Sequence, residues 1–109
     1  MSDVIERLFV VLKDRRDADP SRSYVASLHH RGLNRILEKI GEEAIETVIA
    51  AKDAAISKDP TEVIKETADL WFHTLVMLDH LDISPSSIFA ELELRFGTSG
   101  IAEKQSRNS

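Results

Sequence analysis

The chain has 109 residues, of which 42% are hydrophobic and 30% are charged, which fits one small globular domain and excludes a disordered chain. The net charge of −5 argues against a broad basic surface for nucleic acid, and the absence of cysteine excludes disulfides, zinc–thiolate sites and a cysteine nucleophile. Because no apolar run approaches the roughly 20 residues of a membrane span, and the acidic N-terminus does not resemble a secretory signal, we expect a cytoplasmic protein without membrane or nucleic-acid partners.

The first elements in chain order are two helices separated by a polar loop. Ser2 or Asp3 is suited to cap a first helix, whose apolar residues follow at helical spacing. The polar run 14–20 is expected to end that helix. Residues 23–28 then predict a short helix or turn whose tyrosine, Tyr24, and leucine pack inward.

A long helix is predicted from near Gly32. Its main apolar stripe comprises Leu33, Ile36, Leu37, Ile40, Ala44, Val48 and Ala51. Ile45 and Ile49 fall on nearly the opposite face. Because a surface helix needs only one apolar stripe, two stripes indicate burial on two sides, as in a bundle built from more than one chain. Gly41 inside this helix indicates either close backbone approach by a neighbour or a tolerated defect.

The second half of the chain predicts two more helices and a tail. The sequence 59–62, Asp-Pro-Thr-Glu, is typical of a helix start, and the stretch 70–78 is apolar nearly all round, so this helix should be central. Ser-Pro at 84–85 opens a last helix. We therefore expect one all-α domain over 1–109, a bundle of four to five helices, with residues 97–109 as a flexible tail.

Acidic residues occur in two matched pairs where a core is expected. Glu43 and Glu46 are spaced i, i+3 on the long helix, and Glu66 and Asp69 repeat this spacing on the central helix. Four converging carboxylates would repel one another, and a divalent cation would remove that repulsion. Oxygen ligands without His or Cys favour magnesium or manganese. A solvated helix face is the alternative for these pairs.

Basic residues near the acids also have two interpretations. Lys39 lies four residues before Glu43, and either pairs with it or reaches a phosphate; Lys52 is similarly ambiguous. His73 lies four residues after Asp69, and is either a ligand for a carboxylate or phosphate or a hydrogen-bonded core histidine.

The sequence around the acids resembles the phosphoribosyl-ATP pyrophosphatase family. That family belongs to the all-α nucleoside-triphosphate pyrophosphatase superfamily, which also includes the MazG-type enzymes and dimeric dUTPases. The resembling segments are Ser23-Tyr24, 35–46, 48–52, 66–73 and 95–104. The resemblance implies the all-α pyrophosphatase fold, completed by dimerisation. It also implies the second step of histidine biosynthesis, in which phosphoribosyl-ATP is hydrolysed to phosphoribosyl-AMP and pyrophosphate. Relatives are often fused to a cyclohydrolase domain, and we expect a stand-alone form here.

The same resemblance implies a metal-assisted site. Magnesium, with manganese as a substitute, would be held by Glu43, Glu46, Glu66 and Asp69, and would position the attacking water and offset charge on the leaving pyrophosphate. One of the carboxylates Glu42, Glu43 and Glu46 would accept the water's proton. The expected phosphate contacts are Arg35, Lys39, Lys52, His73 and Lys104. Two rival functions remain: a MazG-like house-cleaning pyrophosphatase for other nucleotides, and a non-enzymatic helical interaction module.

Overall fold

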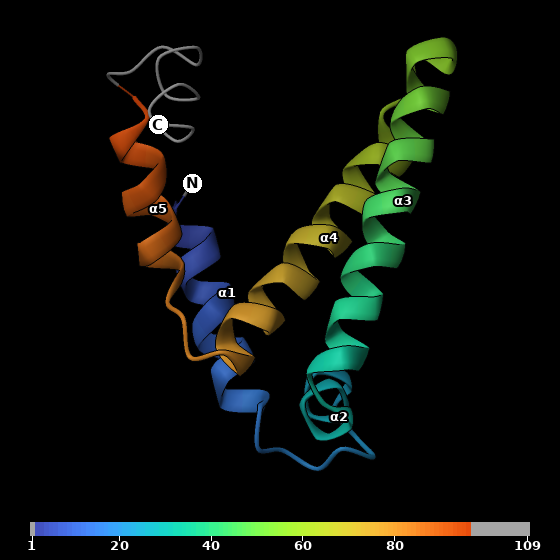
Figure 1. The fold of residues 1–109 in the computed structure, drawn as a ribbon. Coiled ribbons are helices and arrows are strands. Elements are labelled where there is room, and N and C mark those ends of the chain that lie inside the picture. Colours follow the sequence, from blue (N-terminus) through green and yellow to red (C-terminus); the bar gives the residue numbers. More distant parts are fainter. Residues whose placement is uncertain (1, 97–109) are drawn as a thin grey trace.

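The described part of the chain, residues 2–96 of a computed structural model, is built from five α-helices (Figure 1). They are α1 (Ser2–Arg15), α2 (Tyr24–Arg31), α3 (Leu33–Ser57), α4 (Thr61–His80) and α5 (Pro85–Leu94). Residues 2–96 contain no strand, so the all-α class is confirmed. The expected tail 97–109, which includes Lys104, lies outside the described residues. None of the described helices combines the length and apolar character needed to cross a membrane.

Local sequence signals set the helix boundaries. The hydroxyl of Ser23 accepts a hydrogen bond from the backbone N–H of Ala26 at 3.1 Å and so caps α2. Gly32 has φ of 99°, a conformation that glycine adopts readily, and the chain passes there from α2 into α3. The carboxylate of Asp59 accepts hydrogen bonds from the N–H and hydroxyl of Thr61 at the start of α4.

The helices form two arms that meet at a base, so the molecule has the outline of a V (Figure 1). One arm is the antiparallel hairpin of α3 and α4, which the short connection 58–60 joins; the other contains α1 and α5, and α2 lies at the base. The buried core comprises Leu12, Val25, Leu28, Ile36, Leu75, Val76 and Leu78. The radius of gyration is 16.4 Å, against about 13 Å for a compact domain of this length, so the arms are open.

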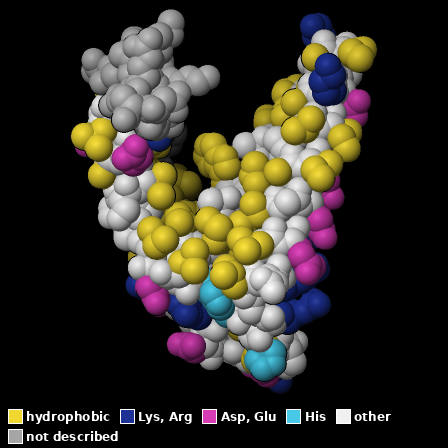
Figure 2. All heavy atoms as spheres, viewed as in Figure 1, with side chains coloured by type: hydrophobic (Ala, Val, Ile, Leu, Met, Phe, Trp, Pro, Cys, Tyr) yellow, Lys and Arg dark blue, Asp and Glu magenta, His cyan; other side chains and the backbone are white. Residues whose placement is uncertain are grey.

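The inside of the V is apolar (Figure 2). A groove of about 590 Å³ between α1, α4 and α5 is lined mainly by hydrophobic side chains, including Trp71, Ile88 and Leu92. On α3, Ile45 and Ile49 are both more than half exposed. The burial on two sides that the sequence indicates is therefore not achieved within residues 2–96 of one chain.

The structure contradicts the prediction for Tyr24 and refines two other local predictions. Helix α1 continues through Asp14 and Arg15 into the expected loop, because basic residues in its last turn suit the helix C-terminus. Leu28 packs inward as expected, but Tyr24 is 51% exposed because it lies in the first turn of α2 at the edge of the base. No described atom outside its own helix turn lies within 4 Å of a Cβ placed on Gly41, so no neighbour within residues 2–96 approaches it closely.

Candidate metal and phosphate site

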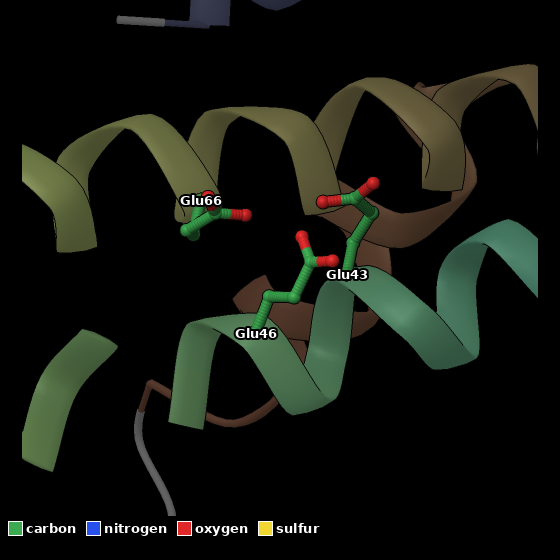
Figure 3. Close-up of side chains that lie close together, drawn as sticks. All are labelled: Glu43, Glu46 and Glu66. Carbon is green, nitrogen blue, oxygen red and sulfur yellow. The ribbon is translucent and has the colours of Figure 1, made fainter. Parts of the chain in front are cut away.

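Three acidic side chains converge between α3 and α4. Glu43 and Glu46 lie one turn apart on α3, and Glu66 reaches toward them from α4 (Figure 3). Each residue offers one carboxylate oxygen, and these oxygens all lie within 4.8 Å of one another. The hairpin therefore brings three of the four predicted acids together.

Asp69, the fourth predicted acid, follows Glu66 by three residues on α4. Its side chain is exposed, and its carboxylate is not part of the close group that the other three form. Its role as a metal ligand therefore stays a prediction.

The side chains of Glu43, Glu46 and Glu66, here called the acid group, are crowded and partly shielded from solvent. Glu43 is only 5% exposed, and one carboxylate oxygen each of Glu43 and Glu66 is buried without a hydrogen-bond partner among the described residues. The hydrogen bond with Glu46, then burial and repulsion by Glu46 and Glu43, raise the pKa of Glu66 to about 7. A solvated helix face does not explain a buried Glu43. Unpartnered carboxylate oxygens suit a magnesium-type cation, so these residues fit the implied metal.

Two basic side chains of α3 pair with glutamates of the same helix, and one of them, Lys39, contacts the acid group. Lys39 Nζ lies 3.4 Å from Glu43 Oε1 and 3.3 Å from Glu42 Oε2. Burial lowers the pKa of Lys39, but the contacts with the two glutamates outweigh burial and leave this pKa raised. Arg35 pairs with Glu38 at 3.1 Å, and its buried Nε has no hydrogen-bond partner among the described residues. This N–H is a donor suited to an incoming anion.

The other candidates occupy different surroundings. Glu42 is exposed and lies within ion-pair distance of both Arg35 and Lys39. Lys52 is exposed on α3, and no ion pair involves it within residues 2–96. His73 is 5% exposed and both of its ring nitrogens are already hydrogen-bonded within the protein, so it can bind a phosphate only by giving up one of these bonds.

The structure also contains a buried polar network that we did not predict. Asp79, which is 3% exposed, has one carboxylate oxygen 3.6 Å from Arg16 Nη1 and the other 3.5 Å from His29 Nε2. Arg16 also donates a hydrogen bond to the backbone oxygen of Asp79 at 2.8 Å. The network joins the chain after α1 to α2 and the end of α4. An acid directly after the apolar run 70–78 was the signal in the sequence.

Comparison with known families agrees with this geometry. Residues 5–96 match the family model described as phosphoribosyl-ATP pyrophosphohydrolase, which covers most of the chain. The match includes the whole acid group together with Arg35 and Lys39. The family's reaction is hydrolysis of phosphoribosyl-ATP to phosphoribosyl-AMP and pyrophosphate in histidine biosynthesis, and this chain is a hydrolase of that kind. The resemblance seen in the sequence is confirmed, and the chain belongs to the phosphoribosyl-ATP pyrophosphohydrolase family.

Proposed function

We propose that the acid group of α3 and α4 is the site at which this chain hydrolyses phosphoribosyl-ATP. The observation that carries this proposal is the convergence of three carboxylates, two of them with buried, unpartnered oxygens, from two neighbouring helices. Glu43, Glu46, Glu66 and Asp69 would hold Mg²⁺, with Mn²⁺ as a substitute.

The reaction breaks the bond between the α-phosphorus and the oxygen that bridges to the β-phosphorus, while a water oxygen forms a new bond to the α-phosphorus. Bound magnesium supplies positive charge that offsets the negative charge on the departing pyrophosphate. A carboxylate of Glu42, Glu43 or Glu46 accepts the proton of the water. Glu42 lies beside the acid group without belonging to it.

Basic residues would hold the phosphates. Lys39 already contacts Glu43, and the unpartnered Nε of Arg35 points to a missing acceptor. We extend the proposal to Lys52, His73 and the tail residue Lys104. His73 would contribute only after exchanging one of its present hydrogen bonds.

The active unit is proposed to be a homodimer in the cytoplasm. The open V, the apolar groove of about 590 Å³ and the exposed Ile45 and Ile49 leave more hydrophobic surface than one small domain leaves uncovered. A second copy presents the same apolar faces, and symmetric pairing is the commonest way to cover them. The absence of cysteine suits a reducing compartment.

The decisive test measures pyrophosphate release from phosphoribosyl-ATP with and without magnesium. We expect release only with the metal, and loss of release in Glu46→Gln and Glu66→Gln. Glu62→Gln is the matched control, because Glu62 is an exposed acid on the same helix as Glu66. Release from dUTP or other free nucleotides but not from phosphoribosyl-ATP would favour the house-cleaning function. No release from any nucleotide would favour a non-enzymatic helical module.

A further inference from the structure

A chain of hydrogen bonds joins α4 to the first turn of α2. His73 Nδ1 lies 2.8 Å from the backbone oxygen of Asp69, and His73 Nε2 lies 2.7 Å from the hydroxyl of Tyr24. A carbonyl oxygen only accepts hydrogen bonds, so Nδ1 carries the hydrogen and Nε2 is left as an acceptor. The hydroxyl of Tyr24 therefore donates to His73, and its oxygen keeps the capacity to accept from another group.

Tyr24 is held in one orientation although half of its surface is exposed. Its ring stacks on Phe72 with 6.4 Å between centroids and 22° between planes, and it meets the His73 ring edge-on at 5.7 Å. Ser23 caps the helix immediately before it. A side chain that is already fixed loses little conformational freedom when a ligand binds, so Tyr24 is preorganised for contact on its open side.

Tyr24 is connected to the proposed metal and phosphate site through His73, which bonds both the Tyr24 hydroxyl and the backbone oxygen of Asp69, a proposed metal ligand. Burial raises the pKa of the Tyr24 hydroxyl, the positive charges of Lys39 and Arg35 lower it, and the nearby carboxylates of Glu43 and Asp69 raise it. Both cations are proposed phosphate contacts, and Glu43 belongs to the acid group. A substrate whose phosphates contact Lys39 and Arg35 at the acid group can extend along the His73 hydrogen bonds toward Tyr24.

Tyr24 and Phe72 together line an open pocket of about 610 Å³. Pockets for small molecules commonly have volumes of about 300–1,000 Å³. Arg15, Arg22 and Asp19 also line it, and because Asp19 lies 4.0 Å from Arg22 Nε, the net charge that they add is one positive charge. The nucleoside of a nucleotide is bonded to its α-phosphate, so it must lie next to the phosphate site. An aromatic wall with hydrogen-bond acceptors suits a nucleoside, which has a planar base and sugar hydroxyls.

We propose that this pocket binds the nucleoside part of the substrate and that Tyr24 positions it, with the phenol ring against the nucleoside and the phenol oxygen accepting one of its hydrogen bonds. His73 is then a positioning residue that keeps both of its hydrogen bonds and acts through Tyr24, in place of the direct phosphate contact proposed above. This inference rests on the proposed function, because it takes the acid group as the place where the phosphates bind.

The experiment measures the affinities of adenosine monophosphate and of pyrophosphate separately, by calorimetry in the presence of magnesium. The first probe has a nucleoside and the second does not. Tyr24→Phe should weaken binding of adenosine monophosphate about two- to tenfold, the range for one lost hydrogen bond, and leave pyrophosphate binding unchanged. Ser27→Ala is the matched control on α2, since it removes a hydroxyl whose one hydrogen bond within residues 2–96 is to the backbone oxygen of Tyr24. It should change neither affinity.

Variants of His73 test the positioning role. His73→Leu should weaken binding of adenosine monophosphate as much as Tyr24→Phe does, and the double variant should be no weaker, because the two residues act as one unit. His73→Gln offers an amide oxygen to the Tyr24 hydroxyl and should restore binding. Circular dichroism checks folding, and if His73→Leu does not fold, the Tyr24→Phe and His73→Gln results decide.

The proposal is overturned if Tyr24→Phe weakens the binding of both probes equally, or of neither. Turnover of phosphoribosyl-ATP by the wild-type protein is measured in parallel. Its absence would refute the proposed function, whereas a wild-type enzyme that is active and whose adenosine monophosphate affinity does not depend on Tyr24 would refute only the nucleoside pocket.

Discussion

Glu66 shows how crowding of single residues governs stability in the metal-free protein. Its pKa is raised from 4.5 to about 7, so the folded chain binds this proton more tightly than the unfolded chain does. The stability from this group is therefore fully present below about pH 4.5 and is lost as the pH rises through about 7. Thermal unfolding in a chelator should show a higher melting temperature at about pH 5 than at about pH 8.

The contribution of Glu66 is isolated by substitution. Glu66→Gln has no proton to lose, so the difference between the two pH values should shrink. Added magnesium should stabilise the wild-type protein most at the higher pH, where the carboxylates are ionised. An unchanged pH dependence in Glu66→Gln would show that another group causes it.

A Lys39 variant tests whether a side chain that forms an ion pair within α3 also binds the substrate. Lys39→Met removes a cation that contacts Glu43 at 3.4 Å. If Lys39 binds a phosphate, kcat/KM for phosphoribosyl-ATP should fall about tenfold to a hundredfold, the range for a charged hydrogen bond. Lys65→Met on α4 is the control, because Lys65 is exposed and, in the part of the chain that the structure describes, pairs only with Glu62. Equal, small effects in both variants would leave Lys39 as a simple i, i+4 partner of Glu43.

At the scale of helices, Gly41 is a weak point in α3. A glycine inside a helix destabilises it by about 1 kcal/mol relative to alanine, and a Cβ at Gly41 meets no described atom within 4 Å. Gly41→Ala should therefore raise the free energy of unfolding by about 1 kcal/mol in urea titration. Retained activity would identify a tolerated defect. A more stable but inactive variant would show that substrate or a second chain approaches this backbone.

The sequence predicted the helices and the acid group because both depend on local spacing. Glu43 and Glu46 needed only one turn of α3 to share a side, and the short connection to α4 brings Glu66 opposite them. Tyr24 was placed wrongly because its position depends on Phe72 and His73, far away along the chain. Spacing within one helix says nothing about such contacts.

Local sequence patterns predicted neither the buried network around Asp79 nor the V shape of the molecule. Asp79 gains its partners from two other elements, the segment after α1 and helix α2, and no periodicity links them. The two apolar stripes of α3 indicated more burial than one chain provides, but did not show which faces would stay open. The arms meet at a base built from segments that are far apart in the chain, so local patterns do not predict their arrangement.

For the whole molecule, the proposed dimer makes a direct prediction. Sedimentation at micromolar concentration should give twice the mass of the chain. Leu92→Glu places a charge in the apolar groove between the arms and should yield monomers with reduced melting temperature. Leu94→Glu is the control, because Leu94 is exposed on the same helix but does not line the groove.

Two results would contradict this interpretation of the groove. A wild-type protein that is monomeric and active would contradict the homodimer. Equal loss of dimer in both leucine variants would show that the interface includes α5 as a whole rather than the groove.

The placement of every described acid of the site on one helical hairpin has a consequence for the order of folding. Residues 33–80 contain α3, α4 and the whole acid group, and the connection between these helices is short. Closing a short loop costs little entropy, so local hairpins form fast compared with contacts between distant segments. During synthesis the hairpin emerges before α5 exists to pack beside α1. The nascent chain thus meets the repulsion among its own carboxylates early, and cellular magnesium would act on folding before it acts on a substrate.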